Sequence, residues 1–209
     1  MNTFAPGAMI RFGWETFKKR PWFFIGVALL VAVLSGVASG IGASFGNQGV
    51  AQSIGSLTNF VIGIFIGMGV TAFFLKSHDS IETAGSGELW HPQPFWYFLG
   101  AKLLVGVVVV LGLVLLIVPG IISGLMFMFT PYIVIDKGLG PIEAMRESKH
   151  ITDGHKWQLL GFVGLTVLVN ILGFLCFLVG LLVTIPLTAL AVVHAYRTLS
   201  AQAKTPVAA

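Results

Sequence analysis

One apolar run, "FWYFLGAKLLVGVVVVLGLVLLIVPGIISGLMFMFTPYIVI" from Phe95 to Ile135, is too long for a single helix across a membrane. It holds one charged side chain, Lys102. A bilayer core of about 30 Å needs roughly 20 helical residues, so this run suffices for two crossings. The "VPG" at Val118 to Gly120 lies near its middle, where proline and glycine end one helix and allow a reversal. The run therefore predicts two membrane spans with a turn between them.

The other apolar regions extend this interpretation. Residues 22–40 and 54–75 are each long enough for one span, and 157–196 is free of Asp, Glu, Lys and Arg and long enough for two, with a turn near Gly180. Hydrophobic residues make up 56% of the chain and charged residues 10%, as in a protein whose main solvent is lipid. The single cysteine, Cys176, cannot form an intramolecular disulfide.

These spans predict an all-α integral membrane protein. We expect six transmembrane helices arranged as three hairpins, in one membrane domain covering residues 1–209, with a flexible tail at 201–209. Two short interfacial amphipathic helices are expected at about 6–19 and 141–151, lying on the cytoplasmic leaflet or joining spans.

Lysine and arginine are concentrated on one side of this topology. With a cytoplasmic N-terminus, no Lys or Arg falls in the opposite loop at 41–53 or in the two tight turns. The positive-inside rule then predicts both termini in the cytoplasm. The same rule accounts for the net charge of +4, so the charge does not indicate nucleic-acid binding.

A short motif recurs where polar sequence gives way to apolar sequence. "KRPWFFIG", "QPFWYFLG" and "GHKWQLLG" each place Trp, two residues, Ile or Leu, then Gly, at the cytoplasmic start of a helix. The tryptophans are expected to anchor at headgroup level, and the glycines one turn deeper to let another helix approach. We expect three related units at 1–75, 76–136 and 137–200. The anchors are Trp22, Trp96 and Trp157, and the packing glycines are Gly26, Gly100 and Gly161.

No pattern of catalytic or cofactor-binding residues is recognisable, so we expect neither an enzyme nor a bound cofactor. His150, Asp153 and His155 are close enough in sequence to bind a metal, but "TDG" is itself typical of a turn, and we interpret them as solvated. Asn170 is the deepest amide in the spans and is expected to contact another helix.

The region from "VPG" to "GHKW" resembles a known group of bacterial proteins. It combines the "VPG" turn, Pro131 and Tyr132 at the end of a span, "EAMRES" from Glu143 to Ser148, and "GHKW" from Gly154 to Trp157. In this pattern it is similar to YciC-like inner-membrane proteins and to the membrane domain attached to some glycerophosphodiester phosphodiesterases. The resemblance implies a six-helix protein of the bacterial cytoplasmic (inner) membrane and no hydrolase activity.

Two functions from different classes fit the sequence. The first is a non-enzymatic accessory or scaffold protein that contacts a membrane protein, a second copy of itself or lipid through its cytoplasmic face. Its candidate surface is "GPIEAMRESKHITDGHK", with Glu143, Arg146, Glu147 and Lys149; the alternative for this stretch is a solvated connector. The second is a small solute transporter or channel subunit, suggested by six spans and a proline, Pro186, inside the sixth.

Overall fold

The computed structural model describes residues 4–44, 49–80, 95–176 and 180–204. Within these ranges the chain is helical almost throughout. The helices are α1 (Pro6–Lys19), α2 (Pro21–Ser44), α3 (Gly49–Asp79), α4 (Phe95–Leu115), α5 (Ile117–Phe127), α6 (Thr130–Lys137), α7 (Pro141–Thr152), α8 (Lys156–Leu175) and α9 (Leu181–Lys204).

Six helical segments in the described residues are long and apolar enough to cross a membrane, as the sequence predicts. They are 21–44, 50–79, 95–115, 117–137, 156–175 and 181–203. Their outward faces carry large exposed side chains such as Val33, Val114 and Leu175, as expected where lipid replaces water. The chain is therefore an all-α protein with six candidate membrane spans.

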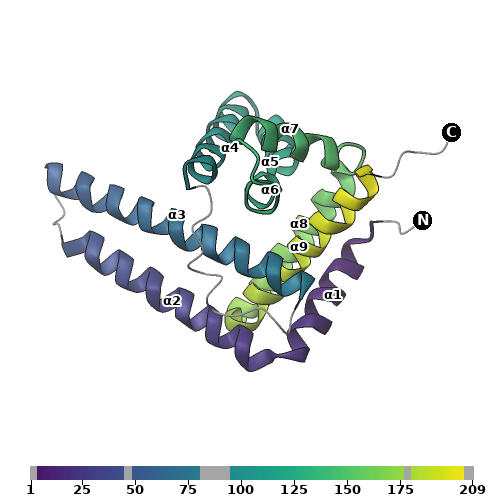
Figure 1. The fold of residues 1–209 in the computed structure, drawn as a ribbon, viewed down its shortest axis with the longest axis horizontal. Helices are drawn as coiled ribbons and strands as arrows, with labels where there is room; N and C mark the ends of the chain where they lie inside the picture. Colours follow the sequence, from purple (N-terminus) through teal and green to yellow (C-terminus); the bar gives the residue numbers. More distant parts are fainter. Residues whose placement is uncertain (1–3, 45–48, 81–94, 177–179, 205–209) are drawn as a thin grey trace.

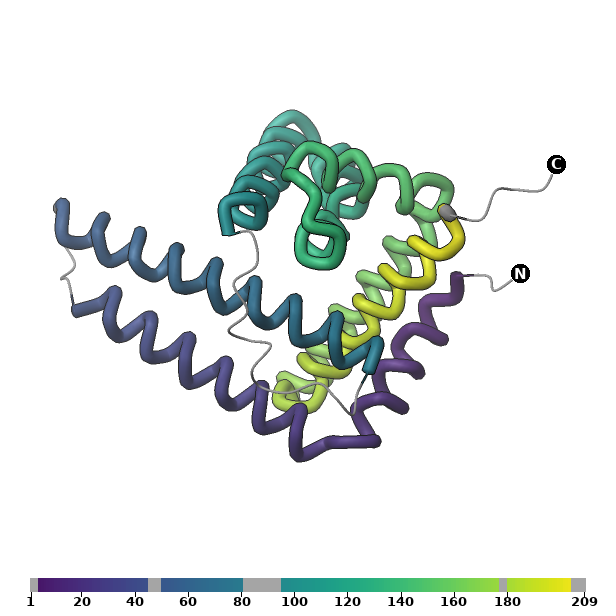
Figure 2. The backbone as a smooth tube through the Cα atoms, viewed as in Figure 1, coloured from purple at the N-terminus to yellow at the C-terminus, as the bar shows by residue number. Residues whose placement is uncertain are grey.

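Neighbouring helices pack in pairs. Figure 1 shows α2 beside α3, α4 beside α5 and α8 beside α9, and each pair is in contact. The α2 and α3 pair extends away from the rest of the molecule, as the tube in Figure 2 makes clear. The helix α1 runs along α9, while α7 packs on α4, α5 and α6.

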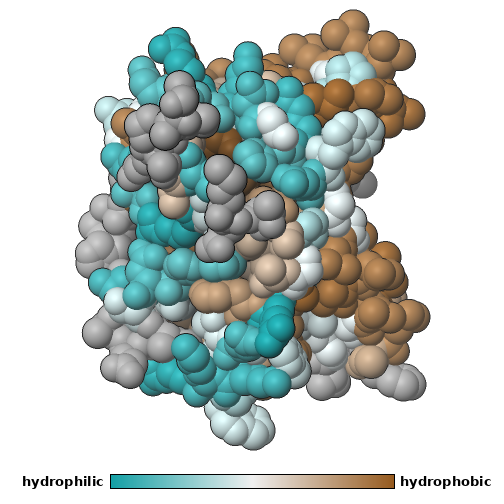
Figure 3. Space-filling view, turned by 90° about the vertical axis from the view of Figure 1, so that its right-hand side faces the viewer, coloured by the Kyte–Doolittle hydropathy of each residue, from teal (hydrophilic) through white to brown (hydrophobic). Residues whose placement is uncertain are grey.

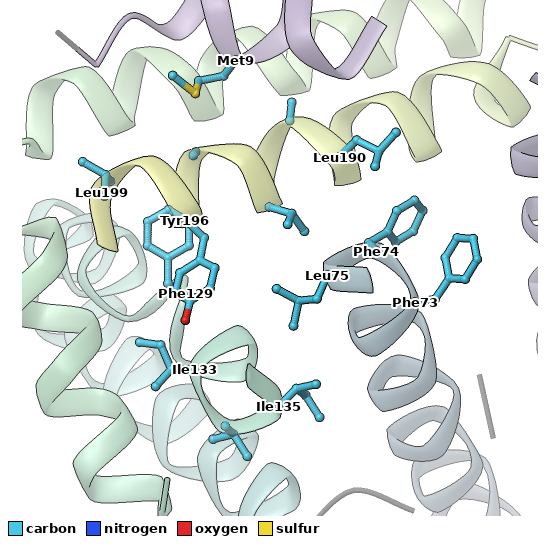
Figure 4. Close-up of a cluster of buried hydrophobic side chains, with 14 of the residues drawn as sticks. Met9, Phe73, Phe74, Leu75, Phe129, Ile133, Ile135, Leu190, Tyr196 and Leu199 are labelled. Atoms are coloured by element: carbon cyan, nitrogen blue, oxygen red, sulfur yellow. The ribbon is translucent and has the colours of Figure 1, made fainter. Parts of the chain in front are cut away.

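The three pairs meet where α3, α6 and α9 come together. Figure 4 shows side chains from these helices gathered in one cluster. Tyr196 of α9 lies close to Phe129, and Leu75 of α3 lies on the side of that helix that faces the cluster. Ring contacts reinforce it: the centroids of Phe129 and Tyr196 are 5.9 Å apart. The largest buried core of the described residues therefore lies at one end of the helix pairs and not along their length.

The reversal expected at "VPG" occurs slightly earlier. The chain turns at Leu116, which is extended with φ −162° and ψ 145°, and Val118 to Gly120 form the first turn of α5. Proline is tolerated there because the first-turn N–H groups have no partner within the helix. The expected position of the turn was therefore wrong by a few residues.

The fourth span is two helices and not one. It breaks at Met128 and Phe129, between α5 and α6, just before Pro131. Proline lacks the N–H that would bond the carbonyl one turn earlier, and its ring pushes that carbonyl away. Side chains of α7 bond the preceding carbonyl, Met126, which is one of the last four of α5 and therefore has no partner within that helix: the hydroxyls of Ser148 and Thr152 donate to it at 2.7 and 3.3 Å.

The sequence predicts that the helix at 6–19 lies on the membrane surface with an arc of apolar side chains toward lipid. In the structure, α1 does not present that whole arc to lipid. Met9 and Phe17 are buried, and Gly13 lies so close to α9 that a Cβ there would collide with the Leu187 carbonyl oxygen. This part of the arc therefore faces protein. At the other end of the chain, α9 continues through Ala201 to Lys204, into the expected tail. Residues 81–94, between α3 and α4, lie outside the described residues.

Candidate functional site

An ionic cluster joins the ends of α3 and α6 to the last third of α9. We call Asp79 of α3, Asp136 of α6, and Tyr196 and Arg197 of α9 the Arg197 cluster. The Arg197 guanidinium donates from Nη1 to Asp136 Oδ2 at 2.8 Å and from Nη2 to Asp79 Oδ2 at 2.6 Å. The Tyr196 hydroxyl donates to the same Asp136 oxygen at 2.7 Å. One planar side chain thus bridges two carboxylates from different helices, which the fixed fork of arginine suits better than lysine.

A pair of histidines extends the Arg197 cluster toward α1. His78 Nε2 and His194 Nδ1 are 3.0 Å apart, and His78 Nδ1 is 3.0 Å from Asp79 Oδ1. Phe12 of α1 stacks on the His194 ring, with centroids 3.8 Å apart and planes 9° apart. The contacts therefore run without interruption from α1 through α9 and α3 to α6.

The Arg197 cluster is partly accessible. The side chains of Arg197, Asp136 and Asp79 are 29%, 19% and 46% exposed. Charges at this depth keep some hydration while their hydrogen bonds are charge-assisted, so the arrangement avoids the full cost of burying ions. Its geometry fixes the three helices relative to one another and supplies a polar end to an otherwise apolar bundle.

These residues were missing from the site predicted from sequence. A signal for two of them exists: Asp136 follows Trp96, and Arg197 follows Trp157, by the same 40 residues. Asp79 also ends the second helix of its pair. Only the fold shows that these parts of α3, α6 and α9 meet.

The predicted surface residues lie on α7. Ala144, Ser148, Ile151 and Thr152 form its buried face, whereas Glu143, Arg146 and Lys149 are exposed. Glu147 is half-buried and accepts a bond from Lys137 of α6 at 2.7 Å. Arg146 and Lys149 make no ion pair with any described residue. The four candidates therefore divide into one that anchors α7 and three that point outward.

The buried face of α7 is held at several points. Ser148 bonds the carbonyl freed by the break between α5 and α6. At the start of α7, Pro141 lies against Gly100 of α4, where a Cβ would come within 2.9 Å of the proline ring. The exposed charges of α7 thus lie on a helix whose opposite face is held by contacts with α4 and α5.

The three tryptophans share one environment. Trp22, Trp96 and Trp157 are 84%, 76% and 84% exposed, each near the start of a candidate span. The three glycines differ. Gly100 faces Pro141, and a Cβ on Gly161 would lie 3.9 Å from Pro6. Gly26 has no described atom within 4 Å of that position.

The remaining polar residues considered from sequence, Asn170 and the group near Asp153, contact nearby residues of α8, α9 and the turn before α8. Asn170 of α8 donates to Thr188 of α9 at 3.3 Å and to the Thr166 carbonyl at 2.9 Å. Asp153 lies 3.4 Å from Lys156, and His155 Nδ1 is 3.1 Å from the Asp153 carbonyl oxygen. Among the described residues, no three His, Cys, Asp or Glu side chains are grouped to bind a metal.

Comparison with known proteins assigns the chain to a family. Residues 98–203 match a family described as "Protein of unknown function (DUF975)". The match covers nearly all of the second and third helix pairs, α7, and three of the four members of the Arg197 cluster: Asp136, Tyr196 and Arg197. The chain belongs to this family.

Curated relatives from mycobacteria are also uncharacterised. The chain is 26% identical over 153 residues to "Uncharacterized protein Rv2560" of Mycobacterium tuberculosis and 25% identical to "Uncharacterized protein Mb2590" of Mycobacterium bovis. Each alignment covers 73% of this chain and 46% of the relative, so the chain spans about half the length of these proteins. No solved structure matches. The narrower resemblance to YciC-like proteins stays a prediction.

Proposed function

We propose that this protein is a non-enzymatic scaffold of the bacterial cytoplasmic membrane, with both termini in the cytoplasm and three helical hairpins in the bilayer. Its cytoplasmic face carries a fixed, charged surface on which a membrane protein, a second copy or anionic lipid docks. The observation that carries the proposal is α7, whose buried face is bonded to α5 while Arg146 and Lys149 face outward.

The distribution of charge supports this orientation. Asp, Glu, Lys and Arg are absent from 21–75, 103–135 and 157–196, so the charges of the described chain lie at the ends where the helix pairs meet. Figure 3 shows the side of the molecule that carries the two termini: hydrophilic residues cover most of it, and hydrophobic ones gather along one edge. A surface divided in this way suits a protein that sits in lipid with one charged side in water.

The fixed geometry of α7 favours docking over a passive connector. A partner that binds a helix already held in place has less conformational entropy to lose than one that must order a loop. Two positive charges on neighbouring turns also attract acidic protein surfaces or anionic headgroups, by about 1 kcal/mol per charge near a charged membrane.

Neutralising two positive charges of α7 tests the docking surface. The double variant Arg146→Gln and Lys149→Gln should insert and accumulate normally, yet lose a partner protein or anionic lipid that copurifies in native nanodiscs. The control double variant, Lys18→Gln with Lys19→Gln on α1, removes the same amount of charge from the same side of the molecule. It should retain the copurifying protein or lipid. Unchanged copurification in the α7 variant would favour the connector, and solute flux in liposomes would favour a transporter or channel subunit.

Cysteine labelling tests the orientation separately. In a Cys176→Ala background, Ser53→Cys should react only with reagent added outside the cell, and Ser80→Cys only with reagent that reaches the cytoplasm. Reaction of both from one side would overturn the proposed topology.

A further inference from the structure

Two histidines from different helices form a hydrogen bond at the charged end of the molecule. His78 lies in the last turn of α3, and His194 lies in α9, three residues before Arg197. His78 Nε2 and His194 Nδ1 are 3.0 Å apart, and the His78 side chain is only 15% exposed. Only one hydrogen fits between two nitrogens at this distance, so one ring donates and the other accepts with a lone pair. At least one of the two rings is therefore neutral.

The other ring nitrogen of His78 limits how many protons the pair can hold. His78 Nδ1 is 3.0 Å from Asp79 Oδ1, where a carboxylate oxygen accepts an N–H. Without an added proton, His78 Nε2 accepts from His194 Nδ1. With one added proton, His78 donates both to Asp79 and to His194. A second added proton puts a hydrogen on both facing nitrogens, and neither can then accept. The bonded pair thus fits no added proton or one, but not two.

A third ring joins the pair to α1. Phe12 stacks on His194, with ring centroids 3.8 Å apart and planes 9° apart, and its centroid is 5.0 Å from that of His78. The backbone of α1 also lies close to α9 at the next residue, Gly13. Three helices therefore meet at these three rings, and a separation of the two histidines disturbs the contact that α1 makes with both α3 and α9.

The charged groups around the pair come from four helices. Asp79 of α3 faces His78 and accepts with its other oxygen from Arg197 of α9, which also bonds Asp136 of α6. On α1, Arg11 and Glu15 lie on either side of Phe12 in sequence and pair with each other at 2.9 Å. No other charged side chain of the described residues, including those on α2, α4, α7 and α8, bonds or stacks with either histidine. Asp79 is thus the carboxylate that favours a first proton on His78.

We propose that the His78 and His194 pair is a proton-sensitive clasp that holds α1, α3 and α9 together and opens when both rings are charged. The first proton is retained by the bond to Asp79. The second places two positive rings against each other in a half-buried site, where their repulsion is screened less than in water. Rings that separate are hydrated and can hold both protons. Acid therefore favours the open form of this junction.

The pH range of the clasp follows from the number of protons that each form binds. A histidine in water titrates near pH 6.5, so the open form takes up its second proton at about that pH. The closed form binds one proton fewer. Its stability relative to the open form therefore falls as the pH drops below about 6.5, and is retained above that value because neither form then holds two protons.

Spin labels on α1 and α3 test the clasp in the full chain. In a Cys176→Ala background, labels on Ala8→Cys and Val61→Cys, both at exposed positions, report the separation of the two helices by pulsed EPR. In nanodiscs the result does not depend on the proposed orientation. From about pH 7.5 to 5.5, where carboxylates stay ionised, a second and broader distance should appear. The ratio of open to closed molecules should rise by up to about tenfold per pH unit, because the open form binds one more proton.

The variant His194→Asn removes the second proton and keeps a partner for His78. The side-chain amide of asparagine takes the place of Nδ1 and can bond His78 Nε2, but it does not titrate. This labelled variant should stay closed over the whole pH range. His150→Asn, at an exposed histidine of α7, is the matched control and should open like the labelled parent chain. An equal rise of the open form in His194→Asn, or no rise in the parent chain, overturns the proposal.

Histidine NMR of the unaltered chain covers the case in which the variant does not fold. With ¹⁵N-labelled histidine, one ring of the pair should take up a proton while the hydrogen bond between the rings persists. The second proton should be bound only over the pH range in which the longer label distance appears. If His78 and His194 instead titrate independently, each like the exposed His150, the proposal is wrong.

Discussion

The charged end of the molecule and the far ends of its helix pairs are held together by different interactions. At the charged end, Arg197 joins two aspartates from other helices. At the far ends, the helices approach each other closely at glycine: a Cβ on Gly112 would lie 2.9 Å from the Gly120 Cα, and one on Gly42 or Gly173 would collide with the side chain of Asn59 or Thr184.

The difference follows from the solvent expected at each end. Lipid tails are as apolar as leucine, so burial from water cannot drive helices together there, and close contact between small residues takes its place. Near the headgroups, ions keep part of their hydration and can pair across helices. The molecule thus combines two ways of holding helices, each at the depth where it is effective.

Removal of the bridging arginine should have the largest effect on stability. Arg197→Ala removes the positive charge that Asp79 and Asp136 share. We expect a loss of about 3 kcal/mol, which is the lower end of the range for breaking a buried ion pair, because the site is partly exposed. Thermal unfolding in detergent measures it. Arg197→Lys should recover only part of the loss, since an ammonium does not bridge both carboxylates. Arg146→Ala, at an exposed position, should change little; an equal loss in both alanine variants would contradict the assignment.

A methyl group at a far end should cost somewhat less. Gly120→Ala forces a Cβ into Leu113 of α4, and overpacking of this kind costs about 2 kcal/mol. Gly124→Ala, one turn along α5, has open space and should be neutral or slightly stabilising because alanine favours helix. Denaturation in mixed micelles compares the two, and equal stabilities would argue against close packing at this end.

Loss of one hydroxyl between α7 and α5 should have a smaller effect. Ser148→Ala removes the bond to the Met126 carbonyl, and Thr152 keeps a longer one, so we expect a loss of about 1 kcal/mol. Ser39→Ala is the reference variant, because the exposed Ser39 hydroxyl donates to a carbonyl of its own helix. This variant should leave the stability unchanged. Limited proteolysis near α7 in both variants provides a local measurement.

The ion pair between α6 and α7 should matter least. Lys137→Met removes the bond to Glu147, whose side chain is 34% exposed, and we expect a loss of about 0.5 kcal/mol that shrinks in high salt. A loss as large as that of Arg197→Ala would mean that the charged end is held by many equivalent pairs and not by the arginine bridge.

Local composition predicted most of the helices. The long apolar runs predicted six spans because a bilayer sets the length of a helix, and the charge-free stretches marked their limits. Errors arose where proline was involved. "VPG" was expected to make the turn although a proline fits the first turn of α5, and Pro131 broke a span expected to be continuous. Both outcomes depend on which neighbouring groups accept or donate the displaced hydrogen bonds.

The apolar lengths, the charge-free stretches between charged segments and the repeated tryptophan motif depend on residue order alone and can be read without a structure. Which parts of the helices meet depends on the packing of the whole chain. Asp79, Asp136 and Arg197 lie far apart in the chain, and no local pattern links them until three helices converge. Contacts between distant segments depend on how whole helices cross, which is set by the sum of many small packing terms and not by any local pattern.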